Sequence, residues 1–224
     1  MVAAQHPIAP DRRKFVASAG LAALGLAVPL ASSAPGTLFR RAAPAPVAAP
    51  VAAAPNLAMP RLFPRAMAAL DLHAERIAHR DRIGVVDFSQ PSREPRFHLV
   101  DLASGAVSSH LVSHGSGSDP ERSGWLQRFS NQPDSNASSR GAFLTAAEYT
   151  GKHGRSRRLV GLDASNSMAE PRAIVIHAAD YVSAAMASAQ GLIGRSQGCF
   201  AFADDALGEI MNRLGPGRLI FAWK

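Results

Sequence analysis

Cys199 is the only cysteine of the 224-residue chain and lies in the segment GLIGRSQGCFAFADDA near its end. A cysteine that performs acyl transfer must ionise to a thiolate, needs a base that takes its proton, and needs donors that stabilise an oxyanion. One cysteine forms no internal disulfide. The sequence therefore leaves three interpretations of this side chain: an intermolecular disulfide, a free reactive thiol or a buried inert group.

A candidate base stands upstream, where His177 closes the apolar run IVIH. A histidine within hydrogen-bond reach can take the thiol proton, and an oxygen acceptor on its other nitrogen fixes its tautomer. Gly198, directly before Cys199, permits a backbone conformation that a Cβ forbids, so the N–H groups of both residues are candidate oxyanion donors. Each feature alone has a structural explanation; together they predict a cysteine-dependent catalytic site.

The surrounding sequence predicts a β-rich α+β domain that positions these groups. Short runs of Val, Ile, Leu and Phe separated by Pro- and Gly-containing turns are typical of strands, and two segments have helical spacing with suitable ends. The predicted strands are 83–89, 96–102, 105–115, a strand ending at His177, and 217–224; the predicted helices are 64–79 and 203–215.

Residues 115–160 contain many Gly, Ser and Asn residues with little periodicity, which predicts a long loop acting as a lid or cleft wall. In its segment EYTGKHG, Tyr149, Lys152 and His153 are candidates for lining a substrate cleft, with a solvated turn as the alternative. Further polar candidates for substrate contact in this stretch are Asn131, Ser138 and Ser139.

The N-terminal 34 residues have the pattern of an export signal. The pair Arg12-Arg13 precedes an apolar run and small residues that end at Ala34, as in signals of the twin-arginine route. An uncleaved anchor is the alternative, but about 15 apolar residues are short for a bilayer. We expect a signal peptide over 1–34, an Ala/Pro-rich linker over 35–61, a catalytic domain over 62–224, no membrane span after cleavage, and a periplasmic or cell-envelope location.

The formal charge of +7 suits an anionic partner such as a lipid headgroup or a cell-wall polymer. No block of Lys and Arg with interleaved aromatic residues follows the N-terminal segment, so nucleic acid is not expected as a partner. His98, His110 and His114 fit no ligand spacing and have no second cysteine beside them, so neither a metal nor another cofactor is expected.

The segments IVIHAADYV and GLIGRSQGCFAF resemble the active-site signature of the L,D-transpeptidases, the YkuD-like cysteine enzymes of bacterial cell-wall synthesis. In that signature a His is followed within twenty positions by Ser/Thr-His-Gly-Cys; here Ser196 follows His177 by 19 positions. Upstream segments such as VSHGSGS, SSRGAFLTAAEYTGKHG and RLVGLD extend the resemblance, from about residue 80 to the C-terminus, to a divergent branch of murein L,D-transpeptidase catalytic domains. The implied fold has sandwich- or barrel-like sheets with a few helices.

The resemblance implies a role for each matching residue. Cys199 would be the nucleophile, His177 the base oriented by a backbone carbonyl, Ser196 the Ser/Thr of the signature, and Gly198 part of the oxyanion site. Two departures concern how substrate is held: Gln197 replaces the histidine before the glycine, and Phe200-Ala201 replaces the polar or basic residues that commonly follow the cysteine. Arg195 beside the motif either binds a stem-peptide carboxylate or faces solvent.

The implied reaction is a two-step acyl transfer on peptidoglycan stem peptides. The Cys199 thiolate attacks diaminopimelate at position 3 of a tetrapeptide stem, the terminal D-alanine leaves, and an amine of a second stem resolves the thioester. The resulting cross-link is of the 3-3 or 1-3 type; water as acceptor would make an L,D-carboxypeptidase instead. A non-catalytic wall-binding module is a further alternative, whereas the order His before Cys fits neither a sortase nor an NlpC/P60 peptidase.

Overall fold

The computed structural model describes residues 59–224. The signal peptide predicted over 1–34 and nearly all of the linker predicted over 35–61 lie outside the described residues, so these domain bounds stay predictions. Within residues 59–224, no helix has the length and apolar character that crossing a membrane requires.

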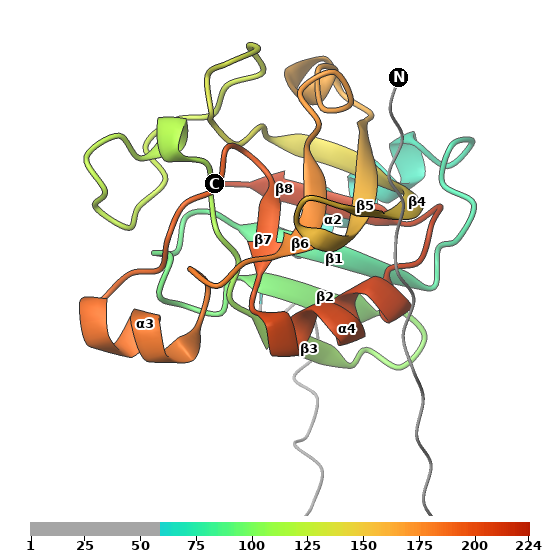
Figure 1. Ribbon diagram of the computed structural model, residues 1–224. Coiled ribbons are helices and arrows are strands. Elements are labelled where there is room, and N and C mark those ends of the chain that lie inside the picture. Colours follow the sequence, from blue (N-terminus) through green and yellow to red (C-terminus); the bar gives the residue numbers. More distant parts are fainter. Residues whose placement is uncertain (1–58) are drawn as a thin grey trace, which may run out of the picture. The chain divides into compact units, whose positions relative to one another are not determined.

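Eight strands of the described chain form one mixed sheet in the order β3-β2-β1-β8-β4-β5-β6-β7 (Figure 1). The pairs β1–β8 and β6–β7 are parallel, and the other neighbours are antiparallel. The strands are β1 Arg82–Asp87, β2 Phe97–Asp101, β3 Val107–His110, β4 Gly141–Gly151, β5 Gly154–Gly161, β6 Val175–Ala178, β7 Phe200–Phe202 and β8 Leu219–Trp223.

The sheet curls into a nearly closed barrel because the chain that follows β3 returns to β7. The Ser113 N–H donates to the Ala201 carbonyl at 3.0 Å, and Gly115 forms an isolated parallel bridge with Ser196. This arrangement covers the edge of β7, which would otherwise expose unpaired backbone groups. The predicted β-rich α+β fold with a few helices is confirmed.

Three helices are present in the described chain: α2 Phe63–Leu72, α3 Ala184–Gln190 and α4 Asp204–Arg213. Along β8, Leu219 and Phe221 pack in the same cluster as buried residues of α2, and Ile220 and Ala222 pack in the same cluster as buried residues of α4. Alternate side chains of a strand face opposite sides of the sheet, so β8 is buried on both. This explains its continuous apolar sequence.

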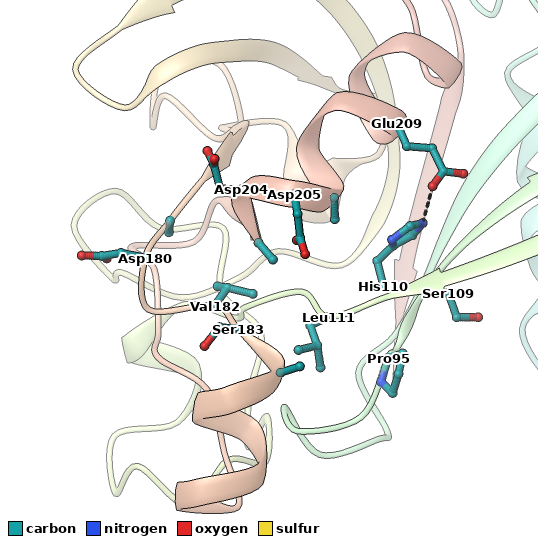
Figure 2. A pocket seen from close by; sticks show the side chains of 14 residues that line it. Pro95, Ser109, His110, Leu111, Asp180, Val182, Ser183, Asp204, Asp205 and Glu209 are labelled. Atoms are coloured by element: carbon teal, nitrogen blue, oxygen red, sulfur yellow. Dashed lines mark ion pairs between the residues drawn. The ribbon is translucent and has the colours of Figure 1, made fainter. Parts of the chain in front are cut away.

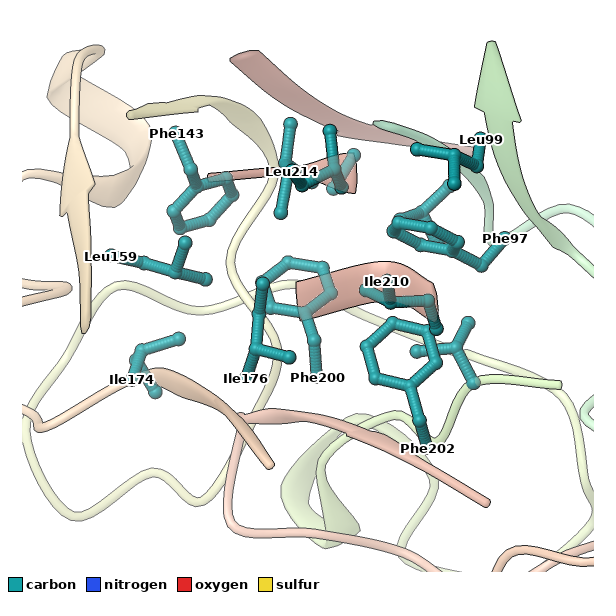
Figure 3. Close-up of a cluster of buried hydrophobic side chains, with 14 of the residues drawn as sticks. Phe97, Leu99, Phe143, Leu159, Ile174, Ile176, Phe200, Phe202, Ile210 and Leu214 are labelled. Carbon is teal, nitrogen blue, oxygen red and sulfur yellow. The ribbon is translucent and has the colours of Figure 1, made fainter. Parts of the chain in front are cut away.

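Phenylalanine side chains fill the core between α4 and the sheet (Figure 3). Phe97 meets Phe202 edge to face at 4.8 Å between ring centroids, and Phe143 meets Phe200 in the same way at 5.3 Å. Burying one such side chain is worth about 1.5–3 kcal/mol. Because Phe200 and Phe202 belong to β7, this core anchors the strand that begins directly after Cys199.

The helix predicted over 64–79 is shorter, because α2 ends at Leu72. His73 caps it, and a separate turn follows in which the Ile77 N–H donates to the His73 carbonyl at 3.1 Å. Ile77 is still buried in the cluster that contains Leu70. The apolar residue beyond Leu72 is therefore buried through a turn and not through a continuation of the helix.

The prediction of a loop over 115–160 is wrong in its second half, where β4 and β5 form the longest hairpin of the described chain. The register shifts between Thr145 and Glu148, so the hairpin has no continuous alternation of period two. Beyond Thr145 no β4 residue is buried and none is a large aliphatic residue, which also removes the apolar signal of a strand. The short elements α3 and β7 were likewise not predicted.

Candidate active site

A tight turn presents Cys199 at the start of β7. The Ser196 hydroxyl donates to the Cys199 carbonyl at 2.8 Å and accepts from the Gly198 N–H at 3.1 Å. Gly198 has φ of +109°, and a Cβ there would lie 2.7 Å from the Ala137 carbonyl oxygen, so the turn requires glycine. Since Ser196 occupies the Gly198 N–H, the Cys199 N–H is the remaining donor of the predicted oxyanion pair.

His177 is fixed by its own strand. Its side chain is 2% exposed, and Nδ1 lies 2.7 Å from the Ala178 carbonyl oxygen. A carbonyl only accepts, so Nδ1 carries the proton and Nε2 is left as an acceptor. Burial lowers the pKa of His177, the Ala178 carbonyl partly opposes this shift, and His153 and Lys152 lower the pKa further. The neutral imidazole is therefore the resting form.

The parallel pairing of β6 and β7 brings the thiol and the imidazole to one face. Ile176 pairs with Phe200 and His177 with Ala201. Continued by one residue, this register sets Cys199 beside Val175, and alternate residues of a strand share a face. Cys199 and His177 thus project from the same face of the sheet, because Val175, the neighbour of Cys199, is two residues before His177 on β6. Both side chains line a cavity of about 430 Å³.

This cavity collects most residues that the sequence predicts for the site. The exceptions are Gly198 and the three loop candidates Asn131, Ser138 and Ser139. The predicted residues that line it are Tyr149, Lys152, His153, His177, Arg195, Ser196, Gln197 and Cys199. The lining residues that were not predicted as site residues are Arg172, Ala173, Val175 and Tyr181, which lie in β6 or within three residues of its ends.

The Cys199 thiol is half-buried and protonated at rest. Burial raises its pKa, while a hydrogen bond from the Val175 N–H and the charges of Lys152 and Arg172 act in the opposite direction. Its Sγ lies 3.5 Å from the Ala173 carbonyl oxygen, to which the thiol donates. A neutral thiol beside a neutral imidazole is the resting pair of a site in which the base takes the proton during attack.

The tip of the β4–β5 hairpin covers His177. The rings of His153 and His177 are stacked, with 4.3 Å between centroids and 21° between planes. On the strands of the same hairpin, the Arg158 guanidinium lies over the Tyr149 ring, 4.6 Å from the ring centroid. The segment EYTGKHG is thus a wall of the cavity, formed by a hairpin and not by the loop that the sequence suggested.

Arg195 lines the cavity with its guanidinium bonded to the Asp119 backbone carbonyl, so it is not a freely solvated side chain. Phe200 points into the core, so the departure at this position concerns packing and not the cavity. Asn131, Ser138 and Ser139 lie outside the cavity lining, and each bonds to a neighbouring segment, at Ala164, Gly115 and Ser130 respectively.

The three histidines that the sequence analysis considered as metal ligands have separate partners. His98 bonds to Ser109, His110 pairs with Glu209 and His114 bonds to Asp119. Among residues 59–224, no group of three or more His, Cys, Asp or Glu side chains is placed to hold a metal ion.

A larger cavity, about 700 Å³, adjoins the N-terminus of α4 (Figure 2). Its rim carries Asp180, Asp204, Asp205 and Glu209, the last of these paired with His110 at 3.7 Å. Neither Cys199 nor His177 lines it. The chemistry predicted from the sequence therefore belongs to the smaller cavity.

Residues 56–223 match the family described as L,D-transpeptidase catalytic domain, YkuD_2. The chain belongs to this family, which confirms the resemblance seen in the sequence, and the family acts on peptidoglycan. Comparison with curated proteins finds no match.

Similar solved structures include an L,D-transpeptidase from Mycobacterium smegmatis, with 15% identity, a TM-score of 0.40, and coverage of 64% of this chain and 59% of that one. Another is an L,D-transpeptidase from Xylanimonas cellulosilytica, with 16% identity, a TM-score of 0.39, and coverage of 71% and 70%. This chain thus spans about three fifths of the length of the mycobacterial protein.

Proposed function

We propose that this protein is a peptidoglycan L,D-transpeptidase that works through a thioester on Cys199. The observation that carries the proposal is the cavity in which Cys199 and His177 project from one face, with His177 Nδ1 bonded to a backbone carbonyl and Nε2 left as an acceptor. Family membership supports the reaction class. The reaction and its residues are otherwise inferred from this geometry.

In the first step the thiol proton passes to Nε2 of His177 while Sγ attacks the carbonyl carbon of the donor residue. An S–C bond forms, and the carbonyl electron pair moves to oxygen, where the Cys199 N–H stabilises it. Collapse of this intermediate breaks the C–N bond to the terminal D-alanine, whose amine takes the proton from His177. In the second step an amine of another stem attacks the thioester carbonyl and forms the new C–N bond, while its proton passes to Nε2 of His177. The S–C bond breaks, and the released Cys199 thiolate takes the proton back from His177.

The charges around the cavity suit an anionic donor. Lys152, Arg172 and Arg195 line it, and among residues 59–224 no Asp or Glu does. A tetrapeptide stem carries carboxylates at its end and on diaminopimelate, which such cations attract. The donor we infer is a stem with diaminopimelate at position 3, and the product is a 3-3 or 1-3 cross-link.

The place of action that we propose is the periplasm or cell envelope, reached by the twin-arginine route. The twin arginine and the apolar run after it support this proposal, and so does the family's action on peptidoglycan.

The test is incubation of the protein with disaccharide-tetrapeptides, followed by mass spectrometry of the products. We expect loss of D-alanine together with new dimers, whose fragmentation assigns the link type. Cys199→Ala should give no product, and His177→Ala should lower kcat/KM by about 10²–10⁴-fold. His79→Ala, a change of an exposed histidine outside the cavity, is the matched control and should behave as the parent.

Two outcomes would replace the proposal with an alternative. Tripeptide monomers without dimers would identify an L,D-carboxypeptidase that uses water as acceptor. Binding of peptidoglycan without any product, unchanged in Cys199→Ala, would identify a non-catalytic wall-binding module.

A further inference from the structure

Arg172 lies just before β6 and is held rigidly beside the Cys199 turn. Its Nη1 donates to the Ser130 carbonyl at 2.9 Å and to the Ser139 hydroxyl at 2.7 Å, and its Nη2 donates to the Ala137 carbonyl. A guanidinium has five N–H groups. Three are thus used to fix the side chain, and Nε–H and one Nη2–H have no acceptor among the described residues.

The free Nη2–H belongs to the nitrogen nearest the nucleophile's turn. A Cβ built on Gly198 would lie 3.0 Å from Arg172 Nη2, and both Arg172 and Cys199 line the same cavity. Since Ser196 occupies the Gly198 N–H, the turn itself offers one backbone donor fewer than its sequence suggests. The Arg172 guanidinium, fixed beside the turn, supplies positive charge near Cys199 where this backbone donor is already occupied.

The backbone next to Arg172 is also shaped toward the thiol. Ala173 has φ of +52°, a left-handed conformation that is strained for a residue with a Cβ. This conformation accompanies the approach of the Ala173 carbonyl oxygen to within 3.5 Å of Cys199 Sγ. Non-glycine strain of this kind gathers at functional sites, where the surrounding structure enforces it.

We propose that Arg172 is the fixed cation that stabilises the Cys199 thiolate, held in place by Ser130, Ala137 and Ser139. This deepens the proposed function and rests on it only in taking Cys199 as the nucleophile. Guanidinium suits the task because it stays protonated and its bonds to the 130–139 loop are already formed before the charge appears, so little reorganisation is needed.

Besides Arg172, six titratable side chains of the described chain line the same cavity as Cys199, so their protonation also affects how its reactivity depends on pH. They are Tyr149, Lys152, His153, His177, Tyr181 and Arg195. Of the cations, Lys152 is exposed at the hairpin tip, and Arg195 is turned to the Asp119 carbonyl. Arg172 is therefore the cation whose position the fold fixes beside the thiol's turn.

The experiment measures the rate of Cys199 alkylation by iodoacetamide against pH, in the full chain and without substrate. The reagent reacts with the thiolate, forming an S–C bond and releasing iodide. We expect Arg172→Gln to react about tenfold more slowly at neutral pH, the effect of one pKa unit, and to reach the parent's rate at alkaline pH. Arg172→Lys should restore most of the neutral rate.

Arg93→Gln is the matched control, because it removes an exposed guanidinium that does not line the cavity; its profile should match the parent's. A profile of Arg172→Gln identical to the parent, or an equal loss at every pH, would overturn the proposal. If Arg172→Gln does not fold, Arg172→Met, which keeps much of the side chain without its charge, is used instead: a profile shifted to higher pH supports the proposal, and a profile identical to the parent overturns it. The assay needs no peptidoglycan, so a failed transpeptidation test leaves its outcome intact.

Discussion

The proposed nucleophile and base are both uncharged at rest, for the same physical reason. Burial disfavours the charged form of each group, so it raises the pKa of Cys199 and lowers that of His177. Proton transfer between them is therefore uphill before substrate binds. Charge stabilisation must come from fixed groups nearby, which is why the cations and the hairpin tip around the pair matter as much as the pair itself.

His153 is the residue whose removal should change the base most directly. Its ring stacks on His177 and its charge lowers the pKa of His177. In His153→Ala both the charge and the covering ring are gone, so the pKa of His177 rises and the base becomes protonated at higher pH. The acid limb of the kcat/KM profile should move to higher pH, measured on the tetrapeptide substrate; His79→Ala should leave it in place. An acid limb that moves to lower pH would contradict this assignment.

At the scale of elements, the sequence predicted best where a segment has a continuous apolar run or regular helical spacing. β1, β2, β8 and α4 lie where the pattern placed them, and so does His177 near the end of β6. The β4–β5 hairpin was missed because its bulge and exposed half remove the alternation. Arg172 was missed because its function depends on a contact with the loop 130–139, which no local spacing records.

Two glycines should respond to alanine with opposite signs, because their surroundings differ. At the end of β5, a Cβ on Gly161 would lie 1.9 Å from the Asn166 carbonyl oxygen, so the chain must move. Gly208, inside α4, has open space around its Cβ position. Gly161→Ala should lower the free energy of unfolding by about 2 kcal/mol or more, and Gly208→Ala should raise it by about 0.5–1 kcal/mol. Urea unfolding measures both; equal effects would show that the close approach at Gly161 is not as described.

Over the whole molecule, a buried network ties distant segments to the site. Arg96 Nη2 donates to His114 Nδ1 at 2.8 Å, and His114 Nε2 lies 3.3 Å from an Asp119 carboxylate oxygen. The His114 carbonyl accepts from the Ser196 N–H at 2.9 Å, and the Asp119 carbonyl accepts from Arg195. The turn before Cys199 therefore rests on a charged network whose members come from segments far apart in the chain.

This network should make the fold sensitive to mild acid. Burial, followed by the charge of Arg96, lowers the pKa of His114 to about 4, below its ordinary value of 6.5. Between these values the unfolded chain binds a proton that the folded chain does not, so stability is present at neutral pH and is lost as pH falls from about 6.5 toward 4. The pKa values of His98, His110 and His177 are lowered as well and act in the same direction.

From pH 7 to pH 4.5, His114 alone should therefore remove about 2 kcal/mol from the free energy of unfolding. Carboxylates with a lowered pKa, such as Asp101 at about 2, lose their contribution to stability only at lower pH. The pH range in which His114 acts is therefore separate from the range in which the carboxylates act. Urea unfolding at several pH values measures the slope. His114→Asn should be less stable at pH 7 and have a shallower slope, while His79→Asn should keep the parent's. A free energy of unfolding that stays constant between pH 6.5 and 4.5 would show that His114 is not held neutral by the fold.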